Sequence, residues 1–343
     1  MKPLYSTLCA AGIIAGFALL AGCSSNATTP TVAQNLSQSV AMTNLLHRGI
    51  PMQHPLAHSW MQPPPKGVKG TIWASDTVYG TVDVISYPSG KLTGQVAGFS
   101  YPDGLCSDKS GNVYVADFEL EKGFEIQAGT RKVINSWPTG GEAVGCSVSS
   151  KGDVAFTNFY PGGVVVFAGG GPTGTSYPGP GYDWPAGYDK NGNLFVECSY
   201  ASPCSNPSLA ELSGGRWHLL NLDTPINFPG AVQLMGATLG VADQAGGPDG
   251  MTLDYTKVSG SSAHDVKKVS FGTASCYAGW ASNWGSLSNN PDGLQKKKID
   301  KIATPNNNCG DDVSIWDAQN GGAPITSLNP PGVSSPQGVT FTK

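Results

Sequence analysis

The sequence predicts an all-β protein, a six-bladed β-propeller, and three observations carry this prediction. The pattern of residues 102–117 returns four more times in degraded form, and 145–158 aligns under 104–117 at a spacing of about 41 residues, which is typical of propellers and solenoids. Each copy contains two short alternating strands around a tight turn. Gly (46) and Pro (26) are abundant, and no helical periodicity is sustained along the repeats.

The strands follow in order. Residues 71–76 form a second strand that has no first strand before it, and the turns at 108–111 and 189–192 carry the Asp, Asn and Gly residues that tight reversals favour. Two further strands per unit make four, the number in a propeller blade. The additional candidates are 82–87, 92–99, 124–127, 132–137, 164–167, 313–316 and 324–328.

The two ends of the repeat region predict how the ring closes. Residues 336–343 form a first strand with nothing after it, so they complete the blade that begins at 71 and remove an exposed sheet edge. Units starting near 101, 142, 183, 228 and 274, each about 45 residues long, then give six blades with the shared one. Seven blades would need shorter units and rank second.

The repeat motif resembles that of the NHL-repeat propellers. It consists of Pro-x-Gly-hydrophobic, Asp-x-x-Gly-Asn and a Val-Tyr-Val-Ala-Asp-like strand, and it is also similar, more loosely, to the gluconolactonase and regucalcin propellers. The likeness covers about 71–343, is most specific at 102–117, and is poor in the last unit, where 274–317 carry an insertion.

The gluconolactonase resemblance implies a divalent cation in the channel mouth, which can be checked position by position. The corresponding residues are Asp103, Val144, Trp184, Pro229 and Gln337. Asp103 alone is a good ligand for a hard cation, and calcium takes six to eight oxygens. We therefore expect no metal and no cofactor, and Asp249 and Asp292 in other Pro-Asp-Gly turns lie outside this register.

The N-terminus predicts export and lipid anchoring. Lys2 precedes an apolar run at 8–21 that is short for a membrane span and ends in Leu20-Ala21-Gly22-Cys23, which resembles a bacterial lipoprotein signal. That resemblance implies cleavage of 1–22, lipidation of Cys23 and, because Ser24 follows, the outer membrane. An ordinary signal peptide is the alternative. Residues 23–70 are rich in Ser, Thr and Pro and form a tether, and 71–343 form the propeller.

The cysteines predict disulfides. Of eight, Cys9 and Cys23 lie in the signal, and the six that remain are an even number in an oxidising compartment. Cys106 and Cys146 have opposite parity on neighbouring inner strands and therefore point at each other. Cys198 pairs with Cys204 across a short turn, which leaves Cys276 with Cys309. No spacing favours zinc instead.

Composition excludes several functions. His218 and His264 are the histidines of the repeat region, and no catalytic motif surrounds either. The basic cluster at 296–301 stands against a net charge of −4, so a nucleic-acid partner is not expected.

A binding surface remains. In a propeller the links between blades gather around one mouth of the channel, where they would bring together Tyr101, Asp103, Glu142, Asp183, Trp184, Phe228 and Gln337. The alternative for Trp184 and Phe228 is a wedge between blades. The sequence thus predicts a membrane-anchored extracytoplasmic binding module of the bacterial envelope, without catalysis, for a protein or small-molecule ligand. A gluconolactonase-like hydrolase or lyase with an altered site, and a structural envelope component, are the alternatives.

Overall fold

The computed structural model describes residues 70–127, 129–247, 250–273, 276–277, 285–286, 301–306 and 311–342. These residues lie in the second of the two units into which the chain divides, Trp60–Lys343. Within them, no helix has the length and apolar character needed to cross a membrane.

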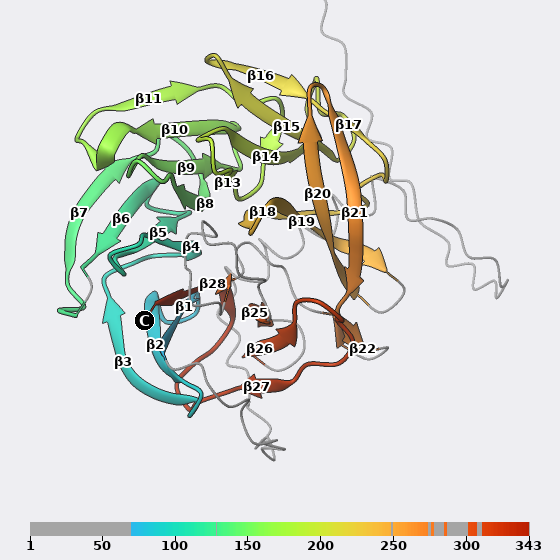
Figure 1. The fold of residues 1–343 in the computed structure, drawn as a ribbon. Helices are drawn as coiled ribbons and strands as arrows, with labels where there is room; N and C mark the ends of the chain where they lie inside the picture. The colour runs from blue at the N-terminus through green and yellow to red at the C-terminus, as the bar shows by residue number, and fades with distance from the viewer. Residues whose placement is uncertain are drawn as a thin grey trace, which may run out of the picture. The chain divides into compact units, whose positions relative to one another are not determined.

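Six of the β-sheets surround one centre as blades, with β4, β8, β18 and β28 innermost and β3, β7, β11, β16, β21 and β27 at the rim (Figure 1). Blade 1 contains β28 (Pro336–Thr342), β1 (Gly70–Asp76), β2 (Thr81–Tyr87) and β3 (Lys91–Ala97). Blade 2 contains β4 (Pro102–Ser107), β5 (Val113–Asp117), β6 (Lys122–Ile126) and β7 (Val133–Pro138). Blade 3 contains β8 (Ala143–Val148), β9 (Val154–Asn158), β10 (Gly163–Phe167), the 3₁₀ turn Ala168–Gly170 and β11 (Gly174–Tyr177).

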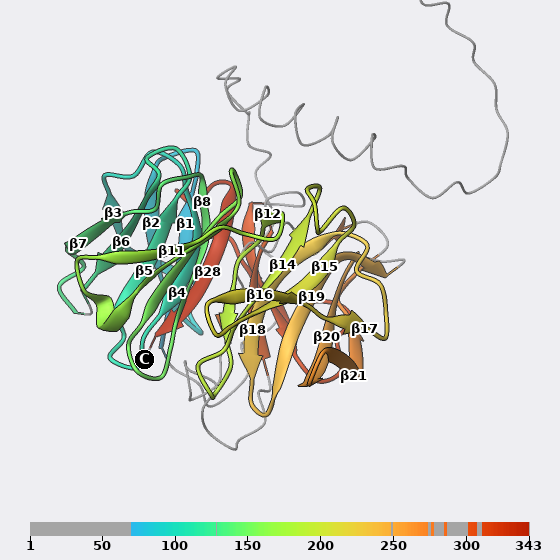
Figure 2. The same cartoon turned by 90° about the horizontal axis from the view of Figure 1, so that it is seen from above.

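The remaining blades are less regular, and Figure 2 shows them from above. Blade 4 contains β12 (Tyr182–Asp183), β13 (Gly187–Tyr188), β14 (Leu194–Ser199), β15 (Ser208–Ser213) and β16 (Arg216–Leu219). Blade 5 contains β18 (Pro229–Met235), β19 (Thr238–Gly247), β20 (Gly250–Ser259) and β21 (Ser262–Ser270), with β17 (Asn221–Leu222) parallel to β21. Blade 6 contains β24 (Gly285–Ser286), β25 (Lys301–Asn306), β26 (Asp312–Asp317) and β27 (Thr326–Leu328).

The predicted six-bladed propeller is confirmed, including closure of the ring by the last strand. β28 pairs antiparallel with β1, so that Phe341 lies opposite Ile72. The units expected near 101, 142, 183 and 228 begin as predicted. The unit expected near 274 differs, because a hairpin of β22 (Gly272–Thr273) and β23 (Cys276–Tyr277) comes first and the inner strand β24 begins at Gly285.

The core consists of six buried clusters, one in each interface between neighbouring blades. Side chains alternate along a strand, so successive residues of β1 enter different clusters: Ile72 packs toward blade 6 and Trp73 toward blade 2. A strand buried on both faces reads as a nearly continuous apolar run. This explains why the second strand of each blade is apolar at odd and at even positions alike.

The repeat motif has a physical reason at each position. In blade 2, Asp108 Oδ1 accepts hydrogen bonds from the amides two and four residues later, those of Ser110 and Asn112. In blade 4, Asp189 Oδ1 accepts from the amides at the same two positions. The glycine that opens each inner strand allows neighbouring strands to approach: a Cβ on Gly338 would lie 2.4 Å from the Asp103 carbonyl oxygen. The motif therefore encodes the hairpin turn and the packing of the inner ring.

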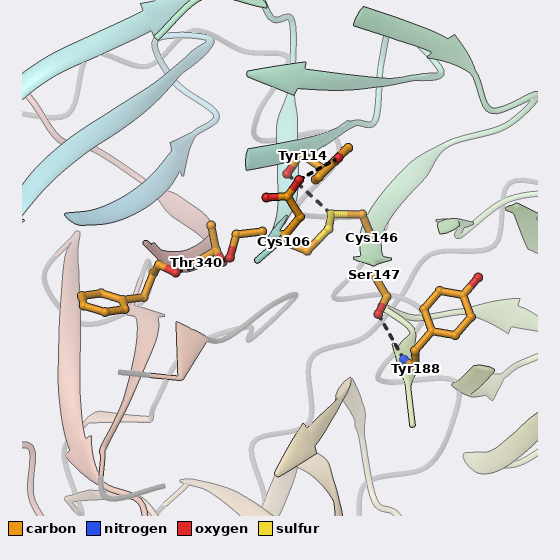
Figure 3. The surroundings of a disulfide bond; sticks show 9 residues. Cys106, Tyr114, Cys146, Ser147, Tyr188 and Thr340 are labelled. Atoms are coloured by element: carbon orange, nitrogen blue, oxygen red, sulfur yellow. Dashed lines mark hydrogen bonds between the residues drawn. A yellow bond between two sulfur atoms is a disulfide. The ribbon is translucent and has the colours of Figure 1, made fainter. Parts of the chain in front are cut away.

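Two of the three predicted disulfides are confirmed. Cys106 on β4 and Cys146 on β8 join blades 2 and 3, with their Cα atoms 5.7 Å apart (Figure 3). Cys198 and Cys204 join the end of β14 to the loop after it. The predicted bond between Cys276 and Cys309 lies outside the described side chains.

Replacing Cys106 and Cys146 together by Ser is expected to lower the free energy of unfolding by about 4 kcal/mol, because the bond constrains a long loop of the unfolded chain. The matched replacement of Cys198 and Cys204, which are 6 residues apart, is expected to cost about 2 kcal/mol on the same basis. Denaturant unfolding of the two double variants measures both values. Equal losses would contradict the loop-closure explanation.

Candidate binding face

One face of the ring is built from the links between blades and from the turns between second and third strands. We call it the link face. Backbone hydrogen bonds tie these two sets of loops together: the Phe118 amide donates to the Tyr101 carbonyl, the Phe159 amide to Glu142, and the Gln244 amide to Phe228. Each link is therefore held by the turn of the blade that it enters.

The seven residues predicted to ring the channel mouth all lie where inner strands begin. Tyr101, Glu142 and Phe228 directly precede β4, β8 and β18, and the others lie at or beside the starts of β4, β12 and β28: Asp103, Asp183, Trp184 and Gln337. Asp183 is fully buried, so its carboxylate supports the loops. The binding role of the ring stays a prediction.

Aromatic side chains on the link face form a continuous row across blades 3 to 5. Tyr160 contacts Tyr182 at 5.9 Å between ring centroids, Tyr182 contacts Phe159 at 5.2 Å, and Phe159 contacts Trp184 at 5.6 Å. Trp184 in turn meets Phe228 at 5.3 Å. Along the row, Tyr160 is 56% exposed, Trp184 is 9% exposed and the terminal Phe228 is half-buried. Trp184 and Phe228 are thus a wedge between blades as well as the inner end of an exposed row.

Buried carboxylates fasten the links, a role that sequence reasoning missed. Asp117, the last residue of β5, accepts hydrogen bonds from the Ser100, Tyr101 and Leu120 amides. Asp76, at the end of β1, and Asp243, within β19, hold the Ser334 and Phe228 amides in the same way. The signal was present in the sequence, because all three follow the same apolar strand pattern.

In blade 4 the carboxyl group that fastens the link comes from a different strand. Its second strand places Cys198 where blades 1, 2 and 5 have Asp and blades 3 and 6 have Asn, and that cysteine is committed to a disulfide. Asp183, directly opposite Cys198 in the β12–β14 pair, supplies the carboxyl group, and its Oδ2 accepts from the Gly163 amide at 2.8 Å. Burial raises the pKa of Asp183 to about 8.

Glu197 is a second buried carboxyl, in the interface between blades 4 and 5. Its Oε2 accepts a hydrogen bond from the Gly230 amide at 3.1 Å, and its Oε1 has no partner among the described residues. Burial, with repulsion from Asp243 and Asp254, raises the pKa of Glu197 well above its ordinary value. Folding thus favours the protonated form relative to the unfolded chain.

The opposite end of the channel is narrow. A hollow of about 50 Å³ lies at the ends of the inner strands, beside the Cys106–Cys146 bond and lined by Ser107, Ser147, Tyr188, Gln233 and Thr340, several of which Figure 3 shows. The Tyr188 amide donates to Ser147 Oγ, and the hydroxyls of Ser107 and Thr340 hydrogen-bond to each other. The polar lining suits a few water molecules rather than a substrate.

The groups that the catalytic alternatives would use can be located within the described part of the chain. Across the described residues, no three His, Cys, Asp or Glu side chains converge as a metal site would require. His264 is exposed and its Nδ1 lies 3.1 Å from Asp223, while His218 lies opposite Glu211 on the outer strands of blade 4. Neither histidine belongs to the link face. Asp249, Asp292 and the lysines at 296–298 lie outside the described residues.

Comparison with known proteins supports the fold and goes no further. No family model matches the sequence, and no curated protein matches it. A functionally unknown protein from Desulfotomaculum acetoxidans has a TM-score of 0.53 at 10% identity over 79% of this chain and 98% of that one. Virginiamycin B lyase from Staphylococcus aureus has a TM-score of 0.51 at 13% sequence identity, over 80% of this chain and 86% of that one. A nidogen/laminin complex has a TM-score of 0.52 at 11% sequence identity, over 80% of this chain and 98% of the matched chain. The protein is therefore a six-bladed propeller that is distantly similar to other propellers.

Replacing Glu197 by Gln is expected to flatten the pH dependence of stability. A carboxyl whose pKa is raised by folding contributes stability below its unfolded pKa of about 4.3, and that contribution is lost as pH rises through the folded pKa. The variant should therefore gain stability relative to wild type as pH rises from about 4 toward the raised folded pKa, by up to ~1.4 kcal/mol per pH unit. Urea unfolding at a series of pH values measures this. Glu119→Gln, an exposed control, should follow wild type, and a Glu197→Gln curve parallel to wild type would contradict the assignment.

Proposed function

We propose that this chain is a lipid-anchored, extracytoplasmic lipoprotein of the bacterial envelope that works as a binding module through its link face. The observation that carries the proposal is the aromatic row, in which side chains from three successive blades meet on one exposed face. Aromatic side chains with a few fixed polar groups are typical of binding surfaces, because they supply large contact areas with little loss of conformational entropy.

Two features support export and anchoring. The signal 1–22 ends in Leu20-Ala21-Gly22 before Cys23, the residue whose lipidation the resemblance implies, and the tether that follows lacks the apolar content of a core. The disulfides Cys106–Cys146 and Cys198–Cys204 agree with an oxidising compartment outside the cytoplasm. Ser24 favours the outer membrane.

Rigidity supports a binding role. The links are fastened by Asp76, Asp117, Asp183 and Asp243, so the link face is preorganised and a partner loses little free energy in ordering it. The fold is shared with virginiamycin B lyase and with a complex that contains nidogen and laminin, which leaves both enzymes and interaction platforms open. The sequence at the channel mouth favours an interaction platform over an enzyme. Among the five positions that correspond to the cation site of the gluconolactonase propellers, Asp103 is the one carboxylate.

Replacing Cys23 by Ala is expected to abolish lipid attachment and to move the protein from the detergent phase to the aqueous phase after phase partitioning of bacterial envelopes. The replacement removes the sulfur that would carry the diacylglycerol. Cys9→Ala, a cysteine in the apolar run of the signal, is the matched control and should leave the partitioning unchanged. If the Cys23→Ala protein associated with membranes as strongly as wild type, the proposal of a lipid anchor at Cys23 would be wrong.

Metal content distinguishes the binding module from a lyase or lactone hydrolase of the cation-dependent kind. The purified protein, with its disulfides intact, is expected to contain no stoichiometric calcium or zinc and to show no thermal stabilisation when either is added. Elemental analysis and thermal melts measure both. One equivalent of metal together with a clear stabilisation would contradict the binding-module proposal and favour the enzyme.

A further inference from the structure

The outer end of the aromatic row adjoins two carboxylates. Glu142 directly precedes β8, its amide donates to the Tyr160 carbonyl at 2.9 Å, and its own carbonyl accepts from the Phe159 amide at 2.8 Å. Glu121, in the turn before β6, contributes the second carboxylate, which repels that of Glu142. We call Glu121, Glu142, Tyr160 and Tyr182 the acidic corner.

Among the described residues, neither Glu121 nor Glu142 forms an ion pair. The ion pairs among the described residues are His264–Asp223 and Lys268–Asp254, and both involve blade 5. Burial, and then the repulsion from Glu121, raises the pKa of Glu142 above its ordinary value. A cation placed between the two carboxylates would relieve this repulsion, so the corner is complementary to positive charge.

A buried acceptor lies at the base of the corner. The amide of Asn158 packs against Gly141, the residue before Glu142, and its Nδ2 donates to the Thr139 carbonyl at 2.9 Å. Its Oδ1 accepts no hydrogen bond from any described residue, although the side chain is only 4% exposed. Such an orphaned acceptor indicates a missing donor, from a water molecule or a ligand.

We propose that the acidic corner binds a cationic side chain, arginine or lysine, of an extended peptide segment in a protein partner. The cation pairs with Glu142 and Glu121 and lies over the Tyr160 ring, where the negative face of the aromatic system attracts it. Neighbouring apolar residues of the segment then contact the row formed by Tyr182, Phe159 and Trp184. The proposal rests on the binding role proposed above.

The charge of the whole propeller favours the same ligand. The bases Lys2, Arg48, Lys66 and Lys69 precede residue 70, which leaves sixteen bases against all twenty-four acids and a formal charge of −8 for 70–343. A field of this sign draws cationic partners and repels anionic ones.

The geometry of the row disfavours a glycan. Sugars stack on flat exposed aromatic faces, whereas Phe159 and Trp184 meet at an interplanar angle of 82° and Trp184 and Phe228 at 69°. Trp184 is buried and Phe159, Tyr182 and Phe228 are half-buried, so Tyr160 is the exposed ring of the row, beside Glu142. That combination matches a cation followed by small apolar contacts.

The probe is an end-blocked, fluorescently labelled nonapeptide of alternating arginine and proline, titrated with the full-length protein and followed by fluorescence anisotropy. A glutamate–proline peptide of the same length is the ligand control. We expect the arginine peptide alone to bind. Glu142→Gln should weaken binding about tenfold by removing a charge-assisted contact. Tyr160→Ala should weaken it about fivefold by removing a cation–π contact.

A matched variant separates site binding from general attraction. Glu211→Gln removes the same charge from β15, in the outer part of blade 4, and should change the dissociation constant less than twofold. Equal weakening by Glu211→Gln and Glu142→Gln, or equal binding of the glutamate peptide, would overturn the proposal. Sugars that compete with the arginine peptide in a Tyr160-dependent way would also overturn it, in favour of a glycan.

The result can be told apart from failure of the binding role itself. If the Tyr160→Ala protein loses an envelope partner that wild type retains, while the arginine peptide does not bind, the link face is a binding face and the ligand class is wrong. If neither partner nor peptide depends on Tyr160, both proposals fail. Circular dichroism of each variant verifies that the fold is retained.

Discussion

The pairing of β28 with β1 is the interaction on which the rest of the structure depends. It joins residues from the two ends of the repeat region, and side chains reinforce the backbone ladder: Trp73 Nε1 donates to Thr342 Oγ1, and the Gly338 amide donates to Ser75 Oγ. Ser75 Oγ also donates to the Asp103 carbonyl, which connects blade 1 to blade 2. Each blade buries its two faces against its neighbours, so opening the ring at one interface would expose two apolar faces.

A closed ring allows the links to be both short and fixed. Because neighbouring blades cannot separate, the carboxylates of Asp117 and Asp243 can hold amides of the link that arrives from the preceding blade. The Cys106–Cys146 bond adds a covalent tie between the inner strands of blades 2 and 3. The link face inherits this rigidity, which is the physical basis for assigning the binding role to it rather than to the narrow opposite end of the channel.

Much of the fold was predictable because the repeat carries redundant information. The glycine, the Asp turn and the apolar second strand recur together, so their spacing predicts blade number and closure, and the parity of Cys106 and Cys146 predicts their bond. Blade 4 was less predictable. Pro185 has no amide hydrogen and the inner strand is divided into β12 and β13, while Asp183 takes over the role of the missing Asp at Cys198. The aromatic row was only partly predictable, since Tyr160 and Tyr182 lie outside the repeat register and meet the others only through the folding of the loops.

Amide hydrogen exchange of the intact protein, followed by mass spectrometry, tests the closed ring most directly. The account predicts that peptides covering 70–76 and 336–342 are protected as strongly as those covering the inner and second strands of blades 2 and 3, and that they open together with them. Rapid exchange of 336–342 while the other blades remain protected would contradict it, because the last strand would then be attached to a ring that holds together without it.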